Sequence, residues 1–333
     1  MQQNPTHNVY PLNSERKLKY LLKSSLNYEE IAEAAGKYYS PFDRFKGLRE
    51  DGSEKWRHID NPIDPLHELQ DKIYHNLLKP FAETLPMYMT GGMPFRSIID
   101  NAAPHLVNEA VLGLDIVDCF PSIGHKRIFQ VWREDLGCSE KIARMLTQLT
   151  TLHFHLPQGS PVSPILCNLA LRPLAEDIYA YANANGLTFT IYVDDITLSG
   201  DKQAVRNAIG VLIPLVQKHG YQLGKDSDKM NIMDSNEIQK TTGLMVNGKL
   251  TVPTKKVDEL FREIQRLGRL GDDAKTYELN SVWGKINFIN GVDPRTATSL
   301  KVHADRHLSN INPISAAKPK DRTRRCKNYK GKH

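Results

Sequence analysis

Two adjacent carboxylates, Asp194 and Asp195, have the residue type and spacing to hold metal ions. Apolar and polar residues alternate over 187–193 and the alternation resumes at 196–198, so we expect the pair at the tip of a β-hairpin. Asp tolerates the unusual backbone angles of a tight turn. Because neighbouring anions repel each other, a divalent cation or a basic partner would offset the repulsion. The alternative is a solvated turn that carries two Asp residues for its geometry alone.

A metal-dependent phosphoryl-transfer site usually needs a third carboxylate from another element. The apolar run 110–114 has the length of a strand and ends in Asp115, and Asp118 follows before Pro121-Ser122 breaks the segment. A carboxylate at the end of a buried strand is poorly explained by packing, because an unpaired buried charge is costly. Asp118 has the alternative of capping the next helix or pairing with a base.

The segment Leu-Pro-Gln-Gly-Ser-Pro-Val-Ser-Pro-Ile-Leu-Cys-Asn at 156–168 lies between the two acidic sites. It resembles motif B of reverse transcriptases, just as 115–122 resembles motif A and Tyr-Val-Asp-Asp at 192–195 resembles motif C. Taken alone, it is a Pro- and Gly-rich loop before a helix that runs through 169–178. By the resemblance, Gly159 would let the backbone approach a bound nucleotide and Gln158 would lie beside it.

Two further segments resemble retron-type bacterial reverse transcriptases. Asn-Ala-Ala-Pro-His at 101–105 matches their NAxxH signature, and Thr-Thr-Gly-Leu at 241–244 is similar to their VTG motif. The chain departs from the family pattern with Val193 in place of alanine, with Thr241 in place of valine, and with a longer segment at 220–229. By this resemblance Asn101 and His105 are candidates for nucleic-acid contact, and the alternative is hydrogen-bonded support of the loop before the buried strand.

The resemblance, which covers about residues 50–300, implies an α+β fold. It is that of a right-hand polymerase with fingers, a palm made of an antiparallel sheet plus helices, and a small helical thumb. The expected division is an N-terminal helical segment at 1–49, fingers (first part) at 50–105, palm with the motif A strand at 106–123, fingers/palm helices at 124–157, palm with motifs B to E at 158–246, thumb at 247–310 and basic tail at 311–333. Patterns of apolar residues and caps predict helices at 18–26, 27–39, 66–77, 201–220, 254–270 and 279–289.

The same resemblance implies templated DNA synthesis by two-metal phosphoryl transfer. Asp115, Asp194 and Asp195 would be catalytic and, with the backbone carbonyl of Ile116, would bind two Mg²⁺ ions. Phe120 matches the family's bulky gate against a ribose 2′-hydroxyl. The other candidates for contact with the incoming dNTP are Arg57, Lys55, Asp118, Cys119, Gln158, Gly159 and Lys229, with Lys225 as a competitor of Lys229 and Arg96 as a lesser phosphate contact.

Basic residues gather on one predicted helix and at the C-terminus. Lys255, Arg262, Arg266 and Arg269 lie opposite the apolar face of 254–270, which suits a thumb helix on a duplex backbone. An ordinary salt-bridged helix explains them equally well, because acidic residues are interspersed. The tail from 318 onward, which contains Arg324 and Arg325, has eight basic residues against Asp321. It suits sequence-blind phosphate contacts, and the alternative is a solubilising disordered end.

Composition agrees with an intracellular nucleic-acid enzyme. The chain has 333 residues, 40% of them hydrophobic, with a mean hydropathy of −0.46 and a net charge of +6. No apolar run approaches the roughly 20 residues of a membrane span, and the first residues lack the features of a signal peptide. Four cysteines without CxxC spacing indicate reduced thiols in the cytoplasm. His153 and His155 have the spacing of a metal dyad, but alternation on a strand explains them adequately.

Membership of the retron group would imply particular partners. These are a cognate structured noncoding RNA, which provides the template and often a priming 2′-hydroxyl, and its short RNA-linked DNA product, msDNA. Phage defence with a separately encoded effector protein follows from the same resemblance. The first alternative is a defence-associated or intron-like bacterial reverse transcriptase that uses another RNA or primer. The second is a noncatalytic RNA-binding scaffold, which the three intact aspartates disfavour.

Overall fold

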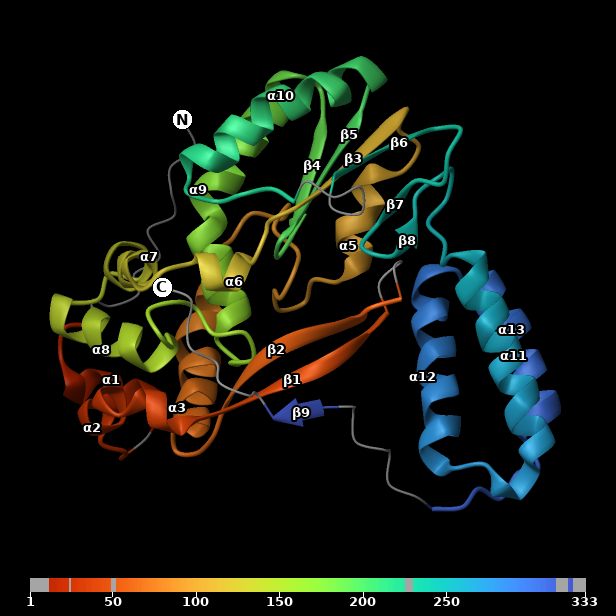
Figure 1. Ribbon diagram of the computed structural model, residues 1–333, viewed down its shortest axis with the longest axis horizontal. Helices are drawn as coiled ribbons and strands as arrows, with labels where there is room; N and C mark the ends of the chain where they lie inside the picture. The colour runs from red at the N-terminus through yellow and green to blue at the C-terminus, as the bar shows by residue number, and fades with distance from the viewer. Residues whose placement is uncertain (1–11, 24, 49–51, 225–229, 316–322, 326–333) are drawn as a thin grey trace.

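The computed structural model of the protein describes residues 12–23, 25–48, 52–224, 230–315 and 323–325 (Figure 1). Lys225 and Lys229, the two candidates for a cation near the leaving group, lie outside these residues. So do residues 1–11 and most of the basic tail, including Cys326.

A four-stranded antiparallel sheet positions the acidic residues (Figure 1). Its strands lie in the order β4 (Thr188–Tyr192), β5 (Asp195–Gly200), β3 (Ala110–Asp115) and β6 (Met230–Asp234). The alternation read from the sequence buries Phe189 and Ile191 of β4. The predicted hairpin is confirmed, because Tyr192 of β4 pairs with Asp195 of β5. The predicted strand at 110–114 is confirmed as β3.

Two long helices, α9 (Ser163–Ala184) and α10 (Lys202–Lys218), pack against this sheet and against each other. Pro164 lies in the first turn of α9, where its missing N–H has no helical partner to lose. The Asp201 side chain accepts a hydrogen bond of 2.8 Å from the backbone N–H of Ala204 and begins α10, as predicted. The apolar faces of both helices belong to the main hydrophobic core.

A second sheet is built from the hairpin of β1 (Tyr39–Leu48) and β2 (Glu54–Pro62), with β9 (Thr323–Arg325) on the other side of β1. The prediction of one helix over 27–39 is wrong in its second half. Helix α2 (Tyr28–Glu33), capped by Asn27 as predicted, is followed by a 3-10 helix (Ala35–Tyr38) and then by β1. Gly36 weakens a helix at this point, and pairing with β2 draws the following residues into a strand.

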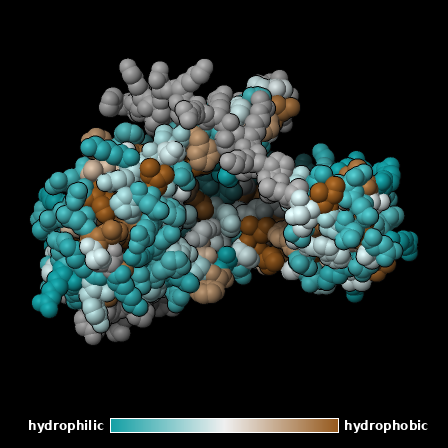
Figure 2. Space-filling view, turned by 90° about the horizontal axis from the view of Figure 1, so that it is seen from below, coloured by the Kyte–Doolittle hydropathy of each residue, from teal (hydrophilic) through white to brown (hydrophobic). Residues whose placement is uncertain are grey.

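The helices α11 (Thr254–Leu270), α12 (Thr276–Val292) and α13 (Pro294–Leu308) form a bundle with a hydrophobic cluster of its own. The predicted helix at 254–270 is confirmed as α11. The predicted helix at 279–289 is confirmed as α12, which extends three residues further at each end, and α13 was missed. Figure 2 shows a largely hydrophilic outer surface on this bundle and a recess between it and the rest of the molecule. The cluster also takes in Val111 of β3 and Met233 of β6, which tie the bundle to the central sheet.

The remaining described elements connect these parts. They are α1 (Glu15–Leu22), α3 (Leu66–Ile73), α4 (Lys79–Ala82), α5 (Ile98–Ala102), α6 (Cys119–Ser122), α7 (His125–Gln130), α8 (Glu140–Thr150), β7 (Lys240–Thr241), β8 (Leu244–Met245), π-helices at Tyr74–Leu78 and Val131–Asp135, and 3-10 helices at Ala103–His105 and Gly271–Asp273. His153 and Phe154 form a turn, not the expected strand, because Leu152 and His155 bond to each other across them. In the described part of the chain, no helix combines the length and the apolar character needed to cross a membrane.

Candidate active site

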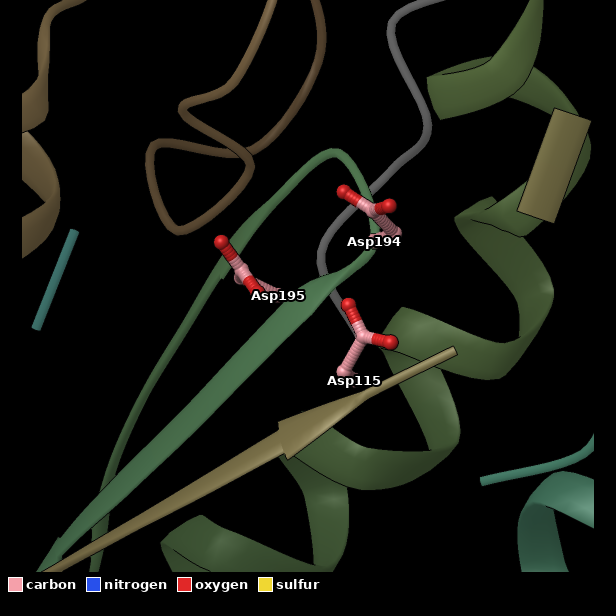
Figure 3. A group of neighbouring side chains, drawn as sticks. All are labelled: Asp115, Asp194 and Asp195. Carbon is pink, nitrogen blue, oxygen red and sulfur yellow. The ribbon is translucent and has the colours of Figure 1, made fainter. Parts of the chain in front are cut away.

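Three carboxylates from two strands and one turn converge at one end of the central sheet (Figure 3). Asp115 is the last residue of β3, and its register partner is Asp195, the first residue of β5. Asp194 lies in the turn between β4 and β5, and its carbonyl oxygen accepts a hydrogen bond of 3.0 Å from the Ile116 N–H. One ligand oxygen of each aspartate lies within 4.8 Å of the others. The hydrogen bond between Ile116 and Asp194 fixes the segment after β3 to the turn.

The turn itself departs from the sequence-based expectation. The residue with left-handed backbone angles is Val193, with φ of 59°, and Asp194 is not among the residues with positive φ in the described chain. A β-branched side chain at positive φ is an outlier, and such strain costs about 1–3 kcal/mol. The surrounding contacts must therefore hold this turn in place.

Charge crowding is the main electrostatic feature of the site. The pKa of Asp195 is raised to about 6, mainly by burial and in addition by the neighbouring charges of Asp194 and Asp115. Carboxylate oxygens are hard ligands of the kind that Mg²⁺ prefers, and a divalent cation would relieve their mutual repulsion. The three side chains therefore fit a divalent metal. Coordination by the Ile116 carbonyl stays a prediction.

No other cluster of three metal-capable side chains occurs in the described ranges. His153 and His155 belong to no such cluster in these ranges. The Nδ1 atom of His155 lies 3.2 Å from the backbone carbonyl of Leu156, a contact that supports the local loop.

The loop that precedes α5 supports the turn between β4 and β5. The Thr90 N–H donates to the Ile191 carbonyl at 2.8 Å, and Gly91 follows directly. A Cβ on Gly91 would lie 2.4 Å from the Val193 nitrogen, closer than real Cβ contacts allow. Asn168 of α9 donates to the Gly91 carbonyl at 2.7 Å. The sequence had indicated a turn at this loop but not its contacts with the β4–β5 turn.

Arg96, the lesser candidate for a phosphate contact, holds this loop together. Its guanidinium donates to the backbone carbonyls of Leu85, Pro86 and Met89 at 2.6 Å each. Satisfying three carbonyls leaves little of the fork for a ligand. The structure therefore favours a supporting role for Arg96 over the expected one.

Three candidates for contact with the dNTP, Asp118, Cys119 and Phe120, follow Asp115 in the chain. Asp118 is exposed and has a φ of 47°; it occupies the N-cap of α6 without a side-chain capping bond. Cys119 is buried, with its Sγ 3.5 Å from the Sγ of Cys167 on α9, so it can reach a nucleotide only through its backbone. Phe120 is half-buried against the main core. A gate at Phe120 stays a prediction.

The structure shows why position 159 is a glycine, which the sequence did not reveal. Its φ is 139°, and a Cβ there would lie 2.7 Å from the Asp60 carbonyl oxygen of β2. Close packing against the neighbouring strand thus requires a glycine here, and an approach of this backbone to a nucleotide stays a prediction. Gln158 is half-buried beside it, and its backbone carbonyl accepts from the Asp60 N–H at 2.7 Å. The side chain of Gln158 stays a candidate for nucleotide contact.

Lys55 and Arg57 are both exposed on β2. Two residues apart on a strand, they point to the same face of the hairpin, and Arg57 lies opposite Arg44 of β1. Three cations thus gather on the hairpin. This arrangement is compatible with phosphate binding.

Asn101 and His105, the candidates for nucleic-acid contact, are fully buried. The Asn101 amide accepts from the Thr90 hydroxyl at 2.7 Å and donates to Thr241 at 3.2 Å, so the two retron-like segments meet in space. Both ring nitrogens of His105 lie within 2.8 Å of hydroxyls on β4 and β5, and burial lowers its pKa to about 4. The structure favours the alternative of internal support, because neither side chain reaches the surface.

The basic residues of α11 were predicted either to face a duplex backbone or to form ordinary salt bridges. Arg266 pairs with Glu278 of α12 at 2.7 Å, an ion pair between two helices and not one of the pairs within α11 that the alternative expects. Lys255, Arg262 and Arg269 are exposed, and the Arg262 Nε donates to the Asp258 carbonyl within its own helix. Arg324 and Arg325 lie in β9, paired in backbone register with residues 42–43 of β1.

The sequence matches a known family across this site. Residues 48–242 match the family model described as reverse transcriptase (RNA-dependent DNA polymerase). Retron Ec86 reverse transcriptase of Escherichia coli is 30% identical over 280 residues, which are 83% of this chain and 85% of that protein. Retron Se72 reverse transcriptase of Salmonella heidelberg (strain 579083-10) is 30% identical over 314 residues, 91% of this chain and 78% of that protein.

One solved structure, telomerase from Candida albicans in complex with the TWJ fragment of telomeric RNA, has a TM-score of 0.48 and 12% identity, covering 85% of this chain and 59% of that one. From the family match and the two retron relatives, the chain belongs to the reverse transcriptase family and, within it, to the retron reverse transcriptases. It is an RNA-directed DNA polymerase of retron type, as the motifs predicted.

Proposed function

We propose that this enzyme copies part of a cognate structured noncoding RNA into a short single-stranded DNA that stays linked to RNA. The observation that carries the proposal is the convergence of Asp115, Asp194 and Asp195 in a chain of the retron family. We further propose that the product serves antiphage defence with a separately encoded effector. The buried free thiols of Cys119, Cys138 and Cys167 suit the reducing cytoplasm.

The chemistry at the site follows from charge and position. Two Mg²⁺ ions held by the three aspartates and the Ile116 carbonyl would activate the primer hydroxyl and stabilise the departing pyrophosphate. The aspartates come from a rigid sheet, so their oxygens keep a fixed geometry toward the reacting phosphate. Base pairing to the template selects the nucleotide. Lys55 and Arg57 would contact its phosphates from β2, and Lys229 or Lys225 would assist the leaving group.

The right-hand division is part of the proposal. The hairpin of β1 and β2 would belong to the fingers, the central sheet with α9 and α10 to the palm, and α11 to α13 to the thumb. The hydrophobic cluster that most residues of the helical bundle's core form, distinct from the main core, supports this division. The recess beside the bundle in Figure 2 would take the duplex, with Lys255, Arg262 and Arg269 toward its backbone. Arg324 and Arg325 would add phosphate contacts at the hairpin.

Phe120 is proposed as the gate against ribonucleotides. Phe120→Ala is expected to raise the incorporation of ribonucleotides relative to deoxynucleotides by about 10- to 100-fold, because the ring would no longer exclude a 2′-hydroxyl. The measurement is the ratio of kcat/KM for one rNTP and the matching dNTP on the same primer and template. Phe129→Ala, which removes another half-buried ring that packs against the same core, is the control. Unchanged sugar selectivity in Phe120→Ala would place the gate elsewhere.

The retron product is tested in cells. The protein, expressed with its native flanking DNA, is expected to co-purify with a discrete short DNA joined to RNA, and Asp194→Ala should retain the RNA but lack the DNA. Sequencing the bound nucleic acid with and without RNase and debranching treatment makes the measurement. Heterogeneous or unlinked DNA would favour a defence-associated or intron-like enzyme, and RNA without DNA in both samples would favour a noncatalytic scaffold.

A further inference from the structure

A chain of three ionisable side chains crosses the hairpin of β1 and β2. The Nδ1 atom of His58 lies 3.1 Å from Oδ1 of Asp43, its register partner on β1, and its Nε2 lies 2.9 Å from Oδ1 of Asp60. An ionised carboxylate only accepts hydrogen bonds. Both nitrogens can donate to these carboxylates together only in a ring that carries a proton on each nitrogen.

Asp60 continues this chain into the turn before α9. Its second oxygen, Oδ2, accepts from the Gln158 backbone N–H at 3.3 Å, and its own N–H donates to the Gln158 carbonyl at 2.7 Å. The Asp60 side chain is 3% exposed, and a buried carboxylate of this kind is costly unless a cation pairs with it. The His58 ring is the side chain that faces its Oδ1.

A neutral contact fixes the same turn from its other side. The Ser160 hydroxyl donates to Oε1 of the buried Gln70 at 2.8 Å, and the Gln70 amide donates to the Leu149 carbonyl and to the Tyr39 hydroxyl. The turn is thus fixed to the helical core through Ser160 and to the hairpin through Asp60. Only the second connection depends on charge.

We propose that Asp43, His58 and Asp60 position the Gln158–Gly159 turn for the incoming dNTP, so that His58 and Asp60 are positioning residues for nucleotide affinity. This inference rests on the proposed function, in which Gln158 lies beside the nucleotide. Arg57, on the opposite face of β2 from His58, contacts the phosphates in the same proposal. The ion-pair chain would then couple the phosphate-binding hairpin to the turn that contacts the base and sugar.

The test is single-nucleotide incorporation on a DNA primer annealed to an RNA template, with kcat and the KM for the dNTP measured separately. His58→Gln and Asp60→Asn are each expected to raise KM about 10-fold with kcat changed by less than about 3-fold. The double variant should have a KM no higher than that of the more impaired single variant, because the two residues act as a unit. His58→Arg, which keeps a cation with several donors, should stay within about 3-fold of the wild-type KM.

Two controls keep the outcome decisive. His67 of α3 also lies between two carboxylates, Asp64 and Asp71, but on the surface, and His67→Gln is expected to leave both constants unchanged. Asp43→Asn keeps the His58–Asp60 pair and should raise KM about 3-fold, which decides the matter if the other variants fail to fold. An unchanged KM in folded His58→Gln and Asp43→Asn would overturn the inference.

Gln158→Ala separates this failure from that of the proposed function. If Gln158→Ala raises the KM for dNTP while the His58 and Asp43 variants do not, the positioning role is wrong and the proposed site stands. If Gln158→Ala leaves KM unchanged, Gln158 does not contact the nucleotide. The proposed contact and the positioning role that rests on it are then both wrong.

Discussion

Asp194→Asn is expected to lower the rate of templated DNA synthesis by at least about 10³-fold, roughly 4 kcal/mol in activation free energy. The amide keeps the shape of the carboxylate but removes its charge. The oxygens of Asp115, Asp194 and Asp195 lie within 4.8 Å of one another, so the loss of one anion weakens the hold on a divalent cation. Single-turnover primer extension on an RNA template at saturating dNTP measures the effect. Activity within about 10-fold of the wild type would contradict it.

Thermal unfolding separates lost metal binding from lost folding. Added Mg²⁺ should raise the melting temperature of the wild type, because it binds the folded state, and should raise that of Asp194→Asn much less. Without metal the variant should be at least as stable as the wild type, because Asp194 is one of the two charges that raise the pKa of Asp195. Asp234→Asn on β6 is the matched control, since Asp234 pairs with Lys202 and Arg206 away from the triad.

Local patterns in the sequence were sufficient for the elements that carry the triad. The alternation at 187–198 predicted the hairpin of β4 and β5, and the apolar run at 110–114 predicted β3. Asp201 and Gly220 bounded α10 correctly. The predicted helix over 27–39 ended on the first residue of β1, and no strand was predicted over 40–48, because no pattern within that segment reveals its pairing with β2 and β9.

The supports of the site were harder to predict, for the same reason. The sequence placed Asp115, Asp194 and Asp195 together through motif spacing, but it assigned the unusual turn angles to Asp and not to Val193. Gly159 was explained by a nucleotide, whereas the structure places Asp60 against it. The burial of His105 agrees with the alternative of loop support, which rested on its position just before a buried strand. Such contacts depend on tertiary packing between segments about a hundred residues apart.

Gly91 is the clearest of these supports, and Gly91→Ala is expected to lower the rate of DNA synthesis by about 100-fold, since a displacement of about 1 Å at a reacting centre has an effect of that size. The added Cβ would lie 2.4 Å from the Val193 nitrogen and 2.5 Å from the Tyr192 carbonyl carbon, both of them backbone atoms. Gly91 itself is fixed by Asn168, so the catalytic turn must move. Single-turnover primer extension at saturating dNTP gives the rate, and a metal titration followed by melting temperature gives the weakened metal binding.

Gly210→Ala provides the control for adding a methyl group without a clash. Gly210 lies within α10 and a Cβ there meets no atom within 4 Å, so the substitution should leave the rate unchanged and stabilise the helix by about 0.5–1 kcal/mol. Gly91→Ala should instead destabilise the fold by about 1–3 kcal/mol, as overpacking does. A variant that lost stability but kept its full rate would show that the turn tolerates displacement. The strain at Val193 makes that outcome unfavourable, because a turn already held at φ of 59° has few alternative conformations that keep Asp194 and Asp195 directed toward Asp115.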